Sequence, residues 1–109
     1  MAGKFVLKST EGDKFRFNLC AGNGQVILTS QAYESKRAAQ SGIASVGKNC
    51  TDRKCIERKE AKNGKPYFTL KATNGQVIGQ SQMYASNAAM EKGIRSVAVN
   101  GNSRVDDRT

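Results

Sequence analysis

The chain has 109 residues, of which 38% are hydrophobic and 25% charged, and its 18 Lys and Arg against 9 Asp and Glu give a net charge of +9. These proportions are those of an ordinary globular protein, and no segment approaches the roughly 18 consecutive apolar residues of a membrane span. Residues 1–5 show no apolar core of a secretory signal. We therefore expect a cytoplasmic protein with no membrane association.

The chain contains an internal repeat with a spacing of 51 residues. When residues 17–46 are aligned with residues 68–97, 17 of the 30 positions are identical. A period of about 50 residues indicates a duplicated structural unit. A unit of that size buries too little surface to be comfortably stable alone, so the two copies are expected to share one core. The sequence predicts a single domain, residues 1–109, built from repeats at about 1–51 and 52–109.

The first part of each repeat has the pattern of β-strands. Apolar and polar residues alternate in residues 5–8 and 15–21, which is the two-residue period of a half-buried strand. Asn23-Gly24 follows, and this pair is preferred in the tight type I′ turn of a hairpin. Residues 25–30 are therefore expected to return antiparallel to the strand before them. The second repeat shows the same pattern.

After these strands the period changes to that of a helix. Ser35 and Ser86 are each placed to cap a helix whose apolar residues recur at intervals of three and four. The two stripes are Ala39, Gly42, Ile43, Val46 and Met90, Gly93, Ile94, Val97. Glycine costs a helix about 1 kcal/mol relative to alanine, so its place on each stripe suggests close packing on the sheet. Arg53-Lys54 and residues 104–106 are candidates for short last strands.

The residues that usually carry chemistry are sparse. Three cysteines, Cys20, Cys50 and Cys55, are an odd number in a chain without a secretory signal, which argues against a disulfide framework. There is no His, no Cys-x-x-Cys pair and no glycine-rich phosphate motif. Without His the commonest general base is missing. We expect no catalytic, metal or cofactor-binding site, and no enzymatic activity.

The repeated motifs resemble those of a known family. Phe-x-Phe-x-Leu-x-Ala, Asn-Gly-Gln-Val-Ile, Ser-Gln-x-Tyr-x-Ser and Gly-Ile-x-Ser-Val, carried in nearly the same form by both repeats, are similar to the YegP-like domain in its tandem-repeat form. The resemblance covers the chain from Phe5 onward. It implies an α+β fold: two β3-α-β repeats, one antiparallel sheet with two helices on one face, and last strands exchanged between the repeats. The family is uncharacterised, so no activity, cofactor or catalytic residue is implied.

Positive charge is the one remaining signal of function. Residues 1–51 carry seven basic and three acidic side chains and residues 52–103 carry nine and four, so the excess is spread over both repeats. The densest segment, residues 53–65, has a simple explanation as an edge strand protected by charge. The alternative is a polyanion-binding surface. Its candidate residues are Arg16, Lys71, Arg53, Lys54, Arg58, Lys59, Lys62 and Lys65.

Three classes of function stay open at this point. The leading hypothesis is a small interaction or accessory module whose partner, protein or nucleic acid, is unidentified. The alternative is weak, sequence-tolerant nucleic-acid or polyanion binding through the open sheet face, and an enzyme or thiol-dependent redox protein ranks last. An aromatic content of 6% with no Trp argues against a dedicated RNA-binding module. Because the duplication supplies an internal pseudo-two-fold pairing, we expect a monomer.

Overall fold

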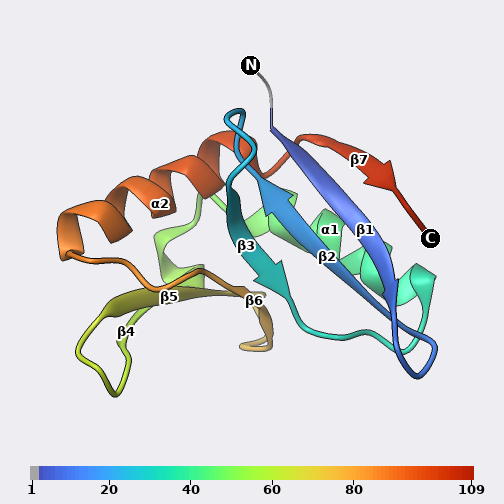
Figure 1. The fold of residues 1–109 in the computed structure, drawn as a ribbon, viewed down its shortest axis with the longest axis horizontal. Helices are drawn as coiled ribbons and strands as arrows, with labels where there is room; N and C mark the ends of the chain where they lie inside the picture. Colours follow the sequence, from blue (N-terminus) through green and yellow to red (C-terminus); the bar gives the residue numbers. More distant parts are fainter. Residues whose placement is uncertain (1–2) are drawn as a thin grey trace.

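The computed structural model describes residues 3–109, and it shows two similar halves that follow one another along the chain (Figure 1). The first half contains β1 (Lys4–Thr10), β2 (Lys14–Cys20), β3 (Val26–Ser30) and α1 (Lys36–Asn49). The second contains a short 3-10 helix, η1 (Arg53–Cys55), and then β4 (Ile56–Glu60), β5 (Pro66–Lys71), β6 (Val77–Gln80), α2 (Asn87–Asn100) and β7 (Arg104–Asp107). The predicted α+β class is confirmed.

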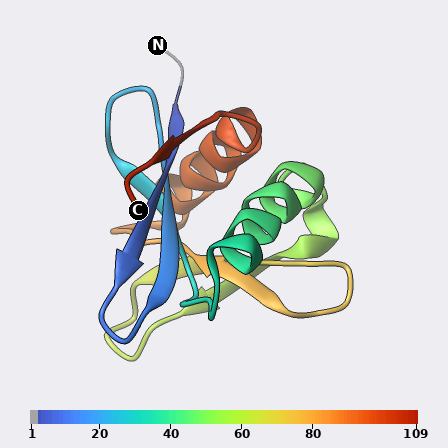
Figure 2. The same cartoon turned by 90° about the vertical axis from the view of Figure 1, so that its right-hand side faces the viewer.

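The strands described by the structure form one 7-stranded sheet in the order β4-β5-β6-β3-β2-β1-β7. The two repeats join at its centre, where β3 and β6 pair antiparallel with Thr29 opposite Gln80 and Ser30 opposite Gly79. The sheet twists strongly between its halves, and both helices lie on the same side of it (Figure 2). Two helices on one face were predicted, and this is confirmed. We call the other side the open face.

The last strands differ from the prediction in two ways. β7 does pair with β1 of the other repeat, beginning with Lys4 opposite Arg104, but the two strands run parallel. The sheet is therefore mixed and not wholly antiparallel, because the chain leaves α2 beside the start of β1 (Figure 1). In the first repeat, Arg53-Lys54 belongs to η1 and forms no strand. The chain enters β4 directly at Ile56, so the residues between α1 and β4 are too few to form a strand at the edge of the other repeat.

The Asn-Gly turns also differ from the predicted type. Gly24 has a φ of 87°, but Asn23 does not have a positive φ, and a type I′ turn needs both. The Gly24 N–H donates to the Ala21 carbonyl and the Ala21 N–H to the Gln25 carbonyl, each at 2.9 Å. This is the longer hairpin loop that ends in a left-handed glycine. It is favoured because Asn23 Oδ1 accepts the Gln25 N–H at 3.0 Å, which fixes the asparagine at negative φ.

Each helix begins after the predicted serine and packs closely against a tyrosine. Ser35 Oγ accepts the N–H three residues later at 3.0 Å, and Ser86 does the same at 3.1 Å. A Cβ on Gly42 would lie 2.5 Å from Tyr33 Oη, so only glycine fits beneath that ring. Tyr33 in turn stacks on Phe17, with ring centroids 6.1 Å apart. Gly93 has the same relation to its own tyrosine in the second repeat.

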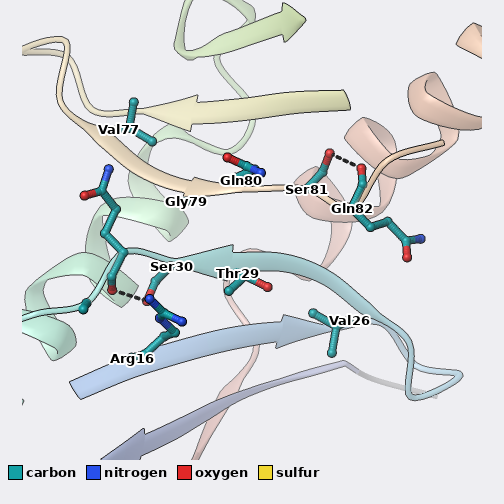
Figure 3. A pocket seen from close by; sticks show the side chains of 11 residues that line it. Arg16, Val26, Thr29, Ser30, Val77, Gly79, Gln80, Ser81 and Gln82 are labelled. Carbon is teal, nitrogen blue, oxygen red and sulfur yellow. Dashed lines mark hydrogen bonds between the residues drawn. The ribbon is translucent and has the colours of Figure 1, made fainter. Parts of the chain in front are cut away.

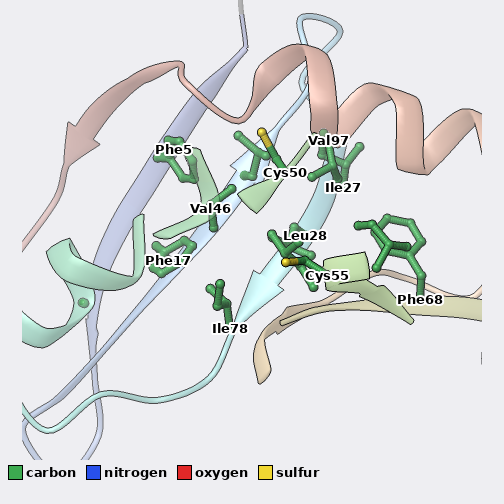
Figure 4. Close-up of a cluster of buried hydrophobic side chains, with 14 of the residues drawn as sticks. Phe5, Phe17, Ile27, Leu28, Val46, Cys50, Cys55, Phe68, Ile78 and Val97 are labelled. Atoms are coloured by element: carbon green, nitrogen blue, oxygen red, sulfur yellow. The ribbon is translucent and has the colours of Figure 1, made fainter. Parts of the chain in front are cut away.

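The core lies between the sheet and the helices, and both repeats contribute to it (Figure 4). Its fully buried members include Phe5, Leu7, Phe17, Leu19, Leu28, Val46, Phe68, Leu70 and Val97. Ile43 and Ile94, assigned to the buried stripes, are only partly buried. The fully buried side chains of the predicted stripes are Ala39, Val46 and Val97. Among residues 3–109, neither helix is long and apolar enough to cross a membrane.

We predict equal losses of stability when the two equivalent valines are truncated. Val46 and Val97 are both 0% exposed, so Val46→Ala and Val97→Ala each remove two buried carbons and leave a cavity. Each should lower the free energy of unfolding by about 2–3 kcal/mol in urea denaturation. Val99→Ala is the control, because Val99 is 81% exposed. A loss below about 1 kcal/mol at Val46 or Val97 would contradict the shared core.

Candidate functional site

A groove of about 610 Å³ lies at the centre of the open face, where the repeats meet (Figure 3). Its walls are supplied about equally by β3 and β6 and the residues that follow them. Uncharged hydrogen-bonding residues dominate these walls: Thr29, Ser30 and Gln31 from the first repeat and Gln80, Ser81 and Gln82 from the second. Arg16, on β2, is the charged residue of the lining. The groove is therefore suited to a polar ligand with an anionic group.

Two equivalent serines hold the backbone beside this groove. Ser30 Oγ accepts the Phe17 N–H at 2.9 Å and donates to the Gln31 carbonyl at 2.8 Å. Ser81 makes the same two bonds in the second repeat, at 3.0 and 2.8 Å, and Figure 3 shows both donated bonds. Each serine is buried, and its hydroxyl accepts one bond from the neighbouring strand and donates one to the carbonyl of the next residue. Their repeated presence in the sequence is explained by structure and not by nucleophilic chemistry.

Arg16 lies opposite another cation and not opposite a carboxylate. It faces Lys8 directly across the β1–β2 pair, and both residues are exposed. Both point to the open face because their neighbours Leu7 and Phe17 are buried in the core. Within residues 3–109 neither side chain forms an ion pair. Like charges directly opposite each other on adjacent strands repel, so an anion bound between Lys8 and Arg16 would offset this repulsion.

Lys8 was missed by the sequence analysis, although a signal for it was present. Phe5 and Leu7 were assigned to the inner face of their strand, so Lys8 had to point outward. The pairing of residue 8 with residue 16 then follows from a hairpin centred on residue 12.

Lys71 and Lys59 share one carboxylate on the open face. Lys71 Nζ lies 2.6 Å from one oxygen of Glu57, and Lys59 Nζ lies 3.0 Å from the other. The hydrogen bonds from Lys71 and then Lys59 lower the pKa of the Glu57 carboxyl group. Two of the predicted polyanion-binding residues are therefore partly neutralised by the chain itself.

Arg58 points to the helix side of the sheet. Its guanidinium donates two hydrogen bonds to the carboxylate of Glu91 on α2, at 2.6 and 2.9 Å. This contact raises the pKa of Arg58 and lowers that of Glu91. Arg58 is thus on the opposite side of the sheet from Arg16 and Lys71, and the three do not belong to one surface.

The other predicted cations lie at the two ends of β4. Arg53 and Lys54 precede the strand, and Lys62 and Lys65 follow it in the turn to β5. In the part of the chain that the structure describes, none of the four forms an ion pair. Four strand spacings separate β4 from β2, which is roughly 19 Å. The eight predicted residues therefore do not form a single patch with Arg16.

The thiols and phenols are placed as structural groups. Cys20, Cys50 and Cys55 are free and buried. Burial raises the pKa of Cys50 and of Cys55, and a protonated thiol is a poor nucleophile and metal ligand. Burial likewise raises the pKa of Tyr33 and Tyr84. Residues 3–109 contain no cluster of three or more His, Cys, Asp and Glu placed to hold a metal ion.

We predict that the paired serines are equally important for stability. Ser30→Ala and Ser81→Ala each leave a buried backbone N–H, that of Phe17 or Phe68, without its acceptor. Each change should lower the free energy of unfolding by about 1–3 kcal/mol. Thermal denaturation of both variants beside Ser41→Ala, an exposed helix position, measures this. Unchanged stability in either serine variant would show that water replaces the hydroxyl.

We also predict that Glu57 titrates below the ordinary range of a glutamate. Its pKa is lowered in the folded state, so its contribution to stability is present at neutral pH and disappears as the pH falls through that lowered value. Lys71→Gln should raise the pKa of Glu57, measured from the carboxyl carbon shift by NMR. Lys62→Gln removes the same charge at a distance and should leave it unchanged. An equal response to both variants would contradict a specific contact.

Comparison with known proteins places this fold in a group of similar chains. The family described as "Domain of unknown function (DUF1508)" matches the chain twice, at residues 11–57 and 61–107. The UPF0339 protein YegP of Escherichia coli K12 is 53% identical over 110 residues, covering 100% of both chains. A UPF0339 protein of Pseudomonas aeruginosa is 55% identical over 97 residues, covering 89% of this chain and 88% of its own length.

Solved structures agree with the arrangement described above. The solution NMR structure of YegP from Escherichia coli, titled a protein of unknown function, superimposes with a TM-score of 0.94 at 53% identity and covers 100% of this chain and 95% of that one. A UPF0339 protein from Shewanella oneidensis gives a TM-score of 0.92 at 48% identity, with coverages of 98% and 92%. The chain therefore belongs to the YegP-like family of tandem DUF1508 repeats, whose function is unknown.

Proposed function

We propose that this protein is a non-enzymatic interaction module, working in the cytoplasm, whose two repeats act together as one binding domain over residues 1–109. The observation that carries the proposal is the facing pair Lys8 and Arg16 at the side of the central groove. Two cations without a carboxylate partner among residues 3–109, next to neutral hydrogen-bonding walls, favour an acidic segment of a partner protein.

The groove suits such a segment better than a catalytic role. Its two serine hydroxyls, those of Ser30 and Ser81, are already bonded to the backbone. Thr29 and Gln80 face each other across the junction of the repeats and offer a hydroxyl and an amide to a polar ligand. Recognition would combine charged contacts to Lys8 and Arg16 with several neutral hydrogen bonds, an arrangement that gives specificity more than raw affinity.

Weak, sequence-tolerant polyanion binding is the second candidate. It is favoured by those of the eight predicted cations that form no ion pair in the described chain, namely Arg16, Arg53, Lys54, Lys62 and Lys65. It is weakened by the pairing of Lys59 and Lys71 with Glu57 and of Arg58 with Glu91. The remaining charges are spread along the molecule, so contacts to phosphate would be few and strongly dependent on salt.

We predict that a glutamate-rich octapeptide binds at the groove and shifts the NMR signals of Lys8, Arg16 and Thr29. Lys8→Gln and Arg16→Gln should each weaken binding by up to about fivefold, the effect of one exposed charge contact. Lys62→Gln is the matched control because it removes one charge away from the groove.

A parallel titration with mixed-sequence single-stranded DNA distinguishes the second candidate. Tighter binding of DNA, with a steep loss between low and physiological salt and similar losses for Arg16→Gln and Lys62→Gln, would favour polyanion binding. Failure of both ligands to move the groove signals would contradict both candidates.

A further inference from the structure

The first strands of the two repeats, β1 and β4, have different surroundings. β1 is flanked by β7, whereas no strand within residues 3–109 pairs with the outer side of β4. The two strands are nevertheless equivalent, because residues 5–9 correspond to residues 56–60 at the repeat spacing of 51. The position beside β4 thus corresponds to the position beside β1 that β7 occupies. The contacts of β7 therefore indicate which contacts a strand beside β4 would make.

The backbone of β4 is oriented to accept a further strand. The Phe68 N–H donates to Ser81 Oγ at 3.0 Å and its carbonyl accepts the Ser81 N–H at 2.8 Å, so the polar groups of Phe68 face β6. Arg58 is opposite Phe68, and its N–H and carbonyl must therefore point away from β5. By the same alternation the Ile56 carbonyl and the Glu60 N–H point outward.

The β1–β7 pair shows how this edge is used in the first repeat. Leu7, the counterpart of Arg58, accepts the Arg108 N–H with its carbonyl at 2.8 Å. β7 runs parallel to β1. Its Asp107 forms an ion pair of 2.6 Å with Lys36 of α1, so Asp107 faces the helices, and Val105 does so by alternation. The strand is held by backbone bonds and by an acidic residue directed at a cation.

A groove runs beside β4 on the helix side. It consists of two adjoining cavities of about 210 and 710 Å³ that share Arg58 and Glu91. The smaller cavity has an apolar floor made by Ile56, Ile94 and Ala98. An apolar side chain from a strand beside β4 would enter this cavity at the level of Ile56.

The groove is also positively charged. Arg53, Arg58 and Arg95 border the smaller cavity together with a single carboxylate, Glu91. Glu91 accepts hydrogen bonds from two of the guanidinium nitrogens of Arg58, Nε and Nη2. In the described chain Arg53 and Arg95 form no ion pair. Three cations against one anion would attract an acidic residue entering from the free edge.

We propose that the outer side of β4 binds an extended segment of a partner protein, which adds to the sheet as a strand parallel to β4. An apolar residue of this segment lies over Ile56, and an acidic residue two positions later faces Arg58 and Arg95. Backbone hydrogen bonds supply the affinity, and the pocket and charges select the sequence. The charges on β4 that oppose random edge pairing thus also select an acidic partner.

A second copy of this chain is a poorer occupant. Its β7 is already paired with its own β1, so donating that strand would uncover one edge to cover another. Two β4 strands paired antiparallel about Arg58 would bring two guanidinium groups directly opposite each other, which is unfavourable. A separate acidic strand meets neither objection.

The test uses the complete chain and a fluorescent octapeptide based on β7. The peptide has the sequence of residues 102–109 with Arg104→Glu, Asp106→Thr and Arg108→Glu, which keeps valine and aspartate at the positions that face the helices. Titration should shift the amide signals of Ile56, Arg58 and Glu60. The same peptide with N-methyl groups at positions 106 and 108 keeps every charge but loses the two N–H donors that would face β4, and it should not bind.

Two protein variants test the two parts of the contact. Arg95→Gln removes an exposed cation of the groove, and Glu60→Pro removes an outward N–H at an edge position where proline is tolerated. Each should weaken binding by about fivefold, whereas Lys62→Gln should not change it. Thermal melts identify any variant that does not fold, in which case Arg58→Gln replaces it.

Three results would overturn this proposal. Equal binding of the N-methylated peptide would mean ionic attraction without strand pairing. Shifts confined to Lys8 and Arg16 would assign the peptide to the central groove and support the proposed function instead. A dimer in sedimentation, with β4 at its interface, would make a second copy the occupant. Conversely, shifts at β4 support the edge site even if the groove binds nothing.

Discussion

The sheet depends on a contact between a large and a small residue at the junction of the repeats. Leu28 and Gly79 occupy the same position in the two copies, and they meet where β3 pairs with β6. A Cβ on Gly79 would lie 2.8 Å from the Thr29 carbonyl oxygen and 3.1 Å from Leu28 Cγ. Leu28 is 0% exposed, so its side chain takes the space that glycine leaves. Two leucines would collide here, and two glycines would leave a void in a closely packed core.

Because β3 and β6 can approach each other in this way, both repeats contribute to one sheet and one core. The helices then cover one face, and the central groove is formed on the other face by the residues that leave the two junction strands. The groove is therefore a product of the duplication, since neither repeat alone has both walls. The same pairing also places β1 and β4 at opposite sides of the sheet, where their different surroundings arise.

Local features of this fold could be predicted from the sequence because they depend on neighbouring residues. The serine caps, the glycines on the helix stripes and the strand alternation are of this kind. The type of the Asn-Gly turn was predicted wrongly, because the Asn-Gly pair alone does not reveal that the Gln25 N–H donates to Asn23 Oδ1. The short helix at Arg53-Lys54 was also missed. Strand propensity does not reveal that β4 begins directly after these residues, which leaves no room for a separate strand.

The predicted cations do not form one patch for a different reason, since charge was counted along the chain and not across strands. Glu57 lies two residues before Lys59 in the sequence but fourteen before Lys71, and only the β4–β5 pairing brings all three together. Lys8 and Arg16 were not predicted to be a pair, because residues that face each other across two strands are distant in the sequence. Net charge predicts attraction to anions in general, whereas register determines where that attraction is available.

Differences between the two repeats identify where the copies have different neighbours. Leu7 lies beside β7 and is buried, and its counterpart Arg58 lies at a free edge. Gln40 of α1 is replaced by Glu91 of α2 in the same comparison, and Arg58 and Glu91 bind each other. A leucine at position 58 would expose apolar surface along an unpaired strand and invite aggregation. The paired change from Leu and Gln to Arg and Glu keeps this edge soluble while leaving its backbone groups accessible, which is the combination required of a strand that pairs only with a chosen partner.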